Sequence, residues 1–215
     1  MPRTLLLVDG FDHFHDLMGA AASLQRTLLA DWIPTPVATG MARFAERGRV
    51  AAGAQVVVLY LTGSSLTAAD LEAFEARVRR GLGVVAVHAS NVGVGDLSPG
   101  GSGEGLLGIV GSRFTGHADF GRLGVEVVGR HPVTEGVDRF EIDDEPYEFS
   151  WVGPEPEVLA VRRVPGGEAH PVLYVKPHGE GRVAYIGLGH DARSWAHPCF
   201  KRLLVQAVRW AGREA

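Results

Sequence analysis

Cysteine is almost absent from the sequence, since Cys199 is the only one among 215 residues. An internal disulfide therefore cannot form, and a zinc site built on cysteine ligands is excluded. The fold must be stabilised by apolar packing, and a hydrophobic content of 46% is sufficient for one sizeable core.

Lysine is scarce too, with Lys176 and Lys201 as the only two, and no segment concentrates basic residues. The formal net charge is -4 and the isoelectric point is about 6.1. A mildly acidic surface without basic clusters gives no electrostatic reason to bind nucleic acid or an anionic membrane. We expect neither as a partner.

Long apolar runs are also missing. The first stretch, MPRTLLLVDG, reaches Asp9 after a few apolar residues, which is too short for the apolar core of a signal peptide. No stretch approaches the ~20 apolar residues of a membrane span. We therefore expect a cytoplasmic protein.

The first half of the chain alternates buried-strand patterns with amphipathic helix patterns. Strands are predicted over 4–10, 54–63 and 84–87, and helices over 16–31 and 67–80, the second capped by Thr67. This alternation predicts a doubly wound α/β fold with a mainly parallel sheet. No segment resembles a linker, so we expect a single domain over residues 1–215.

The second half has shorter strand patterns and predicts an added β-rich part. Two of these patterns, PVLYVKP and GRVAYIGLG, flank HGEG and predict a hairpin, and a last amphipathic helix is expected over 197–212. Between the halves, residues 91–105 are rich in Gly and Ser. This loop is either a mobile border of a functional site or a tolerated surface insertion.

Several polar residues follow apolar strand patterns, and ligands of open parallel sheets bind beyond the carboxyl ends of the strands. His15 follows the first strand, His88 ends VVAV, and His190 with Asp191 closes VAYIGLGHD. The acidic run DDEPY holds Asp144 and Glu145. For each histidine, the alternative interpretation is a surface residue or a hydrogen-bonded core residue.

Signatures of nucleotide binding are missing. The glycine-rich GGSGEG does not end in GK[ST], and no G-x-G-x-x-G follows the first strand. We therefore expect no nucleotide cofactor.

Taken together, several stretches resemble one family. They are GLGVVAVHA (81–89), GSRFTGH (111–117), HPVTEGV (131–137), DDEPYEF (143–149), PVLYVKPHGEGRVAYIGLGHD (171–191), Trp195 and RWA (209–211). In this order they resemble the ThuA-like, or trehalose utilisation, family. The resemblance implies the flavodoxin-like fold of class I glutamine amidotransferases.

The resemblance also bears on His88. In the amidotransferases a cysteine nucleophile follows this strand on a sharp turn, whereas ThuA-like proteins typically have a histidine there, and His88 occupies that place. An imidazole cannot form the thioester of glutaminase chemistry, so we exclude that activity. It can act as a base, an acid or a metal ligand.

The resemblance implies carbohydrate metabolism and a pocket for a small sugar or keto-sugar derivative. We expect His88, Glu145 and His190 to be catalytic, either as acid/base groups or as ligands of zinc or another first-row divalent metal. Substrate contacts are expected from a wider set at the same strand ends: His15, His117, Asp144, Tyr147, Asp191 and Trp195.

Two features of the site follow from these expectations. The acid/base version requires a partly buried Glu145 with a raised pKa, and we expect the ring of His88 to face solvent. The alternative functions are a non-catalytic sugar-binding or accessory module, and a structural protein without a ligand. A homo-oligomer is possible.

Overall fold

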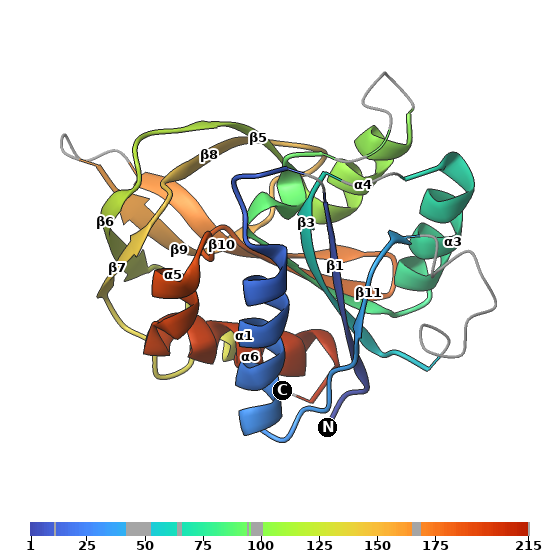
Figure 1. The fold of residues 1–215 in the computed structure, drawn as a ribbon, viewed down its shortest axis with the longest axis horizontal. Helices are drawn as coiled ribbons and strands as arrows, with labels where there is room; N and C mark the ends of the chain where they lie inside the picture. The colour runs from blue at the N-terminus through green and yellow to red at the C-terminus, as the bar shows by residue number, and fades with distance from the viewer. Residues whose placement is uncertain are drawn as a thin grey trace.

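The computed structural model describes residues 1–10, 12–41, 53–63, 66–93, 95, 101–164 and 169–214. A nine-stranded sheet forms the middle layer, with α1, α5 and α6 grouped on one side and α3 and α4 on another (Figure 1). Within these described residues, the helices are too short or too polar to cross a membrane.

The elements follow one another along the chain with these bounds: β1 (Thr4–Gly10), α1 (Leu17–Ala30), β2 (Val37–Ala38), β3 (Val56–Thr62), α3 (Ala68–Arg79), β4 (Gly83–Val87), the 3-10 helix η2 (His88–Asn91), α4 (Ser102–Val110), β5 (Ser112–His117), β6 (Gly121–Val127), the 3-10 helix η3 (Pro132–Thr134), β7 (Phe140–Asp144), β8 (Tyr147–Trp151), β9 (Glu157–Arg163), β10 (Ala169–His178), β11 (Gly181–Ile186), α5 (Ala192–Ala196) and α6 (Pro198–Ala211).

Half of the main sheet is parallel. Strands β2, β1, β3, β4 and β11 are neighbours in this order and pair in parallel. This is the order 2-1-3-4-5 of flavodoxin-like folds, in which ligands bind beyond the strand carboxyl ends. Strands β3 and β4 are buried along their whole length, which explains why their sequences are continuous apolar runs.

The other half is antiparallel and continues the same sheet. From β11 the order runs through β10, β9, β6 and β7, each paired antiparallel with its neighbour. Strands β5 and β8 form a separate two-stranded sheet. The prediction of a mainly parallel sheet therefore needs correction: the sheet is mixed, because the β-rich second half extends it through hairpins instead of helical crossovers.

Three apolar clusters hold the layers together. The largest packs α1 and α6 against one face of the sheet, including Leu24 and Leu204. The second packs α3 and α4 on the opposite face through Phe74 and Ile109. The third is aromatic: Tyr174 and Tyr185 stack with ring centroids 5.1 Å apart and contact residues of β8.

The predicted cap at Thr67 and the predicted hairpin are confirmed, and the structure adds a cap at Asp16. Asp16 caps α1 by accepting a hydrogen bond from the Gly19 N–H. Thr67 and Asp70 form a capping box at the start of α3, and β10 and β11 form the predicted hairpin. Each of these features depends on residues close in sequence.

The capping box gives a stability prediction. Thr67 Oγ1 accepts from the Asp70 N–H at 3.2 Å, and Asp70 Oδ2 accepts from the Thr67 N–H at 3.1 Å. Thr67→Ala removes the first of these bonds and is expected to lower the free energy of unfolding by about 1 kcal/mol in urea denaturation. Thr67→Ser, which keeps the hydroxyl, serves as control, and an equal loss in both variants would contradict a capping role.

Candidate functional site

Four potential metal-ligating side chains meet beyond the carboxyl ends of the parallel strands. His15 follows β1, His88 follows β4, His190 follows β11, and Glu145 comes from the turn between β7 and β8. One nitrogen or oxygen of each lies within 4.8 Å of the corresponding atom of every other. The structure thus brings together the three residues expected to be catalytic, and it adds His15 as a full member of the cluster.

His88 begins a sharp turn directly after β4. Its φ is +48°, in the left-handed region that non-glycine residues rarely adopt, and its side chain is fully buried. Ring atom Nδ1 donates a hydrogen bond to the Gly187 carbonyl at 3.2 Å. The other ring nitrogen, Nε2, faces the cluster. The expectation that this ring faces solvent is wrong, because β11 and the aromatic ring of Tyr147, 4.1 Å away between centroids, cover it.

His15 is oriented by a carboxylate behind it. Its Nδ1 donates to Asp12 at 3.0 and 3.1 Å from the two oxygens, and its Nε2 is buried without a hydrogen-bond partner among the described residues. Burial and the nearby ring of His88 lower the pKa of His15, which outweighs the attraction of Asp12. The neutral ring thus presents a lone pair to the cluster. Asp12 was missed at the sequence level, although the spacing DHFH places it three residues before His15.

The two carboxylate oxygens of Glu145 face different neighbours: Oε2 faces the cluster, and Oε1 faces His117 outside it. Oε2 lies 3.1 Å from His190 Nδ1 and 3.4 Å from His88 Nε2, while Oε1 lies 3.9 Å from His117 Nε2. Burial by itself raises the pKa of Glu145, but the imidazoles of His190 and His88 outweigh it and hold the pKa far below its usual range. The raised pKa expected for Glu145 is therefore wrong, because the carboxylate faces imidazoles and not apolar surface.

The protons available to these four groups are few. His15 Nε2 and Glu145 Oε2 present lone pairs, while His190 Nδ1 lies 3.3 Å from His88 Nε2 and 3.1 Å from Glu145 Oε2 and can donate one hydrogen. The hydrogen bond with Glu145 raises the pKa of His190, against the effect of burial. Loss of the hydrogens that point inward would leave three imidazole nitrogens and one carboxylate oxygen as electron-pair donors, and such a set suits a bound cation.

The carboxylate of Asp144 holds the backbone that carries two residues of the cluster, Glu145 and His190. Its side chain is fully buried. Oδ2 accepts from the Gly189 N–H at 2.7 Å, and Oδ1 accepts from the N–H groups of His190 at 3.1 Å and Glu145 at 2.9 Å. The expectation that Asp144 contacts substrate needs correction, because both oxygens are engaged by the backbone and neither reaches solvent.

The remaining predicted residues lie around this centre in different roles. His117 is at the mouth with 39% of its side chain exposed, and its ring is stacked on Tyr147. Asp191 caps α5 and pairs with Arg193, with Oδ2 2.9 Å from Nε. Trp195 is buried and donates through Nε1 to the Gly189 carbonyl at 2.6 Å, so it supports the β11–α5 turn. Its predicted contact with substrate stays a prediction.

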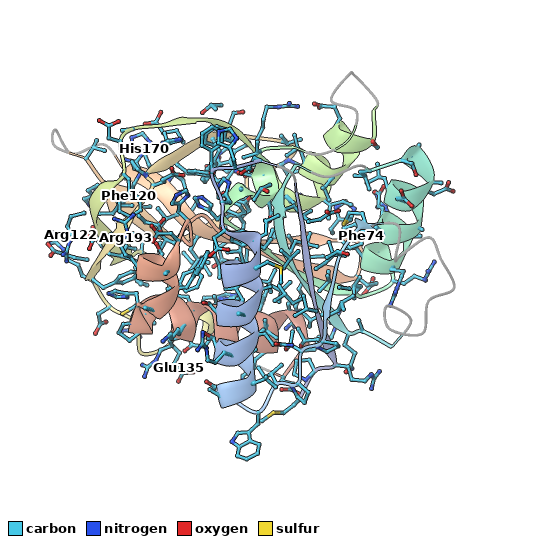
Figure 2. The ribbon with its side chains drawn as sticks, in the orientation of Figure 1. Phe74, Phe120, Arg122, Glu135, His170 and Arg193 are labelled. Atoms are coloured by element: carbon cyan, nitrogen blue, oxygen red, sulfur yellow. The ribbon has the colours of Figure 1, made fainter. Side chains whose placement is uncertain are left out.

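Phe120 adds an aromatic ring to the edge of the site that the sequence did not indicate. Its centroid is 5.9 Å from that of His190, and the guanidinium of Arg193 lies 3.7 Å above the ring. Figure 2 shows Phe120 and Arg193 next to each other. The loop predicted over 91–105 begins at the end of η2 and ends within α4. Residues 94 and 96–100 in its middle lie outside the described residues, so the predicted position of the loop at the site stays a prediction.

The sequence pattern of the trehalose utilisation (ThuA) family matches residues 7–211. The chain belongs to the ThuA family. No curated protein gives a significant match.

Solved structures with the same fold include two described as ThuA-like. The protein from Parabacteroides merdae is 18% identical with a TM-score of 0.82, and covers 100% of this chain and 91% of its own. The protein from Bacteroides uniformis is 19% identical with a TM-score of 0.72, and the match covers 98% and 91% of the two chains. At these identities the likeness establishes the fold.

A β-galactosidase from Rahnella sp. R3 has the fold as one part of a longer chain. It is 16% identical with a TM-score of 0.70, and the match covers 98% of this ThuA-family chain but 31% of the galactosidase. The likeness to the glycosidase is therefore one of fold over about a third of that enzyme.

Asp144→Asn tests the support beneath the cluster. The side-chain amide of asparagine cannot accept hydrogen bonds from all three backbone donors, so buried N–H groups lose their partner. The free energy of unfolding is therefore expected to fall by about 3 kcal/mol. Denaturation monitored by circular dichroism measures this loss. Asp143→Asn is the matched control, since its carboxylate is 40% exposed and pairs with Arg122 at the surface. Equal losses in both variants would contradict the positioning role of Asp144.

Proposed function

We propose that this ThuA-family protein is a metal-dependent enzyme of carbohydrate metabolism that acts on a small sugar or keto-sugar derivative. The observation that carries the proposal is the convergence of four donor atoms, within 4.8 Å of one another, at the carboxyl ends of the parallel strands. The family's association with trehalose utilisation supports the substrate class.

The donor set favours zinc or another first-row divalent metal. Zinc and other first-row divalent ions accept imidazole nitrogens as ligands, whereas Mg²⁺ and Ca²⁺ prefer oxygen ligands. A set of three imidazole nitrogens and one carboxylate oxygen therefore favours the first-row ions. The ring nitrogens of His15 and His88 that face away from the cluster donate to Asp12 and to the Gly187 carbonyl, which is the outer-shell arrangement typical of metal-ligating histidines. A bound ion of this kind would polarise a carbonyl or hydroxyl oxygen of the substrate.

The chain's own residues supply binding and proton transfer at the mouth of the site. Nδ1 of His117 donates to the Ala118 carbonyl at 2.8 Å, so the proton taken from the substrate would be held at Nε2, 3.9 Å from Glu145 Oε1. The ring of Phe120 at the edge of the site offers an apolar surface for the C–H face of a sugar. Exposed fractions of 16% or less for the four donor side chains keep most water out.

Metal content provides the first test. We expect the purified full-length chain to bind about one equivalent of zinc or another first-row divalent ion, measured by plasma mass spectrometry, with a matching increase in the melting temperature. His15→Ala should weaken this binding at least about 100-fold, since even outer-shell changes cost 10–100-fold. His15 lies on a loop, so the variant should keep its fold.

His178→Ala is the control for this experiment. His178 Nε2 also lies 3.1 Å from a carboxylate, Glu75 Oε1, but outside the cluster. Unchanged metal content in this variant together with loss in His15→Ala is the expected result. No stoichiometric metal in the wild-type protein, even after incubation with each ion, would end the metal proposal.

Turnover provides the second test. We expect the metal-loaded protein to convert 3-keto-glycosides, monitored by chromatography of the products, and chelation to reduce the rate at least about 100-fold. His117→Gln should lower the rate by roughly 10²-fold while leaving metal content unchanged. Binding of the keto-sugar without conversion would favour the alternative of a sugar-binding module.

A further inference from the structure

Three fully buried tyrosines lie on strands of the main sheet: Tyr60 on β3, Tyr174 on β10 and Tyr185 on β11. Phenylalanine would fill nearly the same space, and a buried hydroxyl is unfavourable unless it finds a hydrogen-bond partner. The partner of each hydroxyl therefore indicates what the tyrosine contributes beyond packing.

The hydroxyl of Tyr185 holds the turn that carries His88. It donates to the His88 carbonyl at 2.9 Å, in the residue whose φ is +48°. The ring of Tyr185 also lies against Gly187, since a methyl group at Gly187 would be 3.2 Å from ring atom Cε1. The Gly187 carbonyl accepts from His88 Nδ1. Tyr185 thus contacts the backbone of His88 directly and supports its imidazole through Gly187.

The hydroxyl of Tyr60 has the corresponding place at His190. It lies 3.1 Å from the Gly189 carbonyl oxygen and 3.2 Å from the His190 carbonyl oxygen, so its one hydrogen is shared between the two. The ring of Tyr60 lies edge-on to that of His15, with centroids 6.4 Å apart. Tyr60 therefore contacts the backbone of one cluster histidine and the ring of another.

The two tyrosines approach the cluster from opposite faces of the sheet. Tyr60 belongs to the apolar cluster that packs against α1 and α6, whereas Tyr185 belongs to the aromatic cluster. Ala184 and Ile186, on either side of Tyr185, belong to the α1 and α6 cluster, as the alternation of side chains along a strand requires. The turns that carry His88 and His190 are thus held from both faces.

We propose that Tyr60 and Tyr185 are positioning residues of the candidate site, which fix the main chain of His190 and His88 so that both imidazoles point into the cluster. The inference rests on the proposed metal site, because it concerns how two ligands of that site are held. Each hydroxyl bonds to main-chain oxygen and acts through the histidine that it holds. Outer-shell partners of metal ligands act in this way.

Tyr174 provides a matched control. It stacks on Tyr185, but its hydroxyl lies 3.1 Å from the Val110 carbonyl oxygen and 2.8 Å from Ser112 Oγ. Ser112 Oγ also accepts from Asn91 Nδ2, and this bond does not involve the tyrosine. Tyr174→Phe thus removes a buried hydroxyl of the same kind without removing a contact of a cluster histidine.

Two backbone amides report on the two turns without any metal. The Val92 N–H bonds to the Ala89 carbonyl at 2.9 Å in the turn that begins at His88. The His190 N–H bonds to Asp144 Oδ1 at 3.1 Å in the turn after β11. The ratio of their hydrogen-exchange rates, measured by NMR, separates local loosening of one turn from a general loss of stability, which affects both amides.

The two variants are expected to move this ratio in opposite directions. Tyr185→Phe should raise the exchange rate of Val92 relative to His190 roughly fivefold, and Tyr60→Phe should lower the ratio by a similar factor, since each variant loses a hydrogen bond in one turn. Tyr174→Phe should leave the ratio at its wild-type value.

Binding of Zn²⁺, measured by titration calorimetry of the full chain, provides the second readout. Tyr60→Phe and Tyr185→Phe should each raise the Kd for Zn²⁺ roughly tenfold, and Tyr174→Phe should not, although all three variants lose a buried hydrogen bond and melt at a lower temperature.

The two readouts separate this inference from the proposed function. A wild-type protein that binds no metal would end the metal proposal, while the exchange ratios would still decide the positioning role. Wild-type ratios in both Tyr60→Phe and Tyr185→Phe would overturn the inference. A Zn²⁺ affinity in Tyr174→Phe as weak as in the other two variants would overturn it as well.

Discussion

One buried carboxylate holds together the two loops on which the candidate site depends. Asp144 accepts hydrogen bonds from three backbone N–H groups, one beside it and two in the turn after β11. A buried charge of this kind is costly to desolvate, and three backbone donors compensate it without any counter-ion. Two of these N–H groups belong to Glu145 and His190. The Asp144 carboxylate therefore fixes the distance between the side chains of these two residues.

The other half of the cluster depends on the parallel strands. In an open sheet with order 2-1-3-4-5, the carboxyl ends of β1, β4 and β11 meet at one edge, which delivers His15, His88 and His190 from distant parts of the sequence. The left-handed turn at His88 directs its ring back across this edge. Backbone strain at such a position persists only when surrounding contacts fix it, and here β11 and Tyr147 enclose the ring.

The chemistry of the cluster follows from where its hydrogens are. Outer hydrogen bonds from His15 and His88 leave both inward nitrogens as electron-pair donors, next to a carboxylate. The hydrogen of His190 Nδ1 lies among these groups. The proposed divalent cation would take its place and use all four electron pairs at once. The imidazoles of His190 and His88 hold the pKa of Glu145 far below its usual range, so the carboxylate stays ionised.

The sequence by itself determined the features that depend on local patterns. The alternation of strands and helices, the caps at Asp16 and Thr67, the hairpin and the place of His88 after an apolar strand all follow from residues close in the chain. The tertiary structure alone decided the mixed character of the sheet, the burial of His88 and of Asp144, and the role of Asp12 behind His15. These features depend on contacts such as that between Asp144 and Gly189, 45 residues apart, and no local periodicity records which distant backbone groups a buried carboxylate will meet.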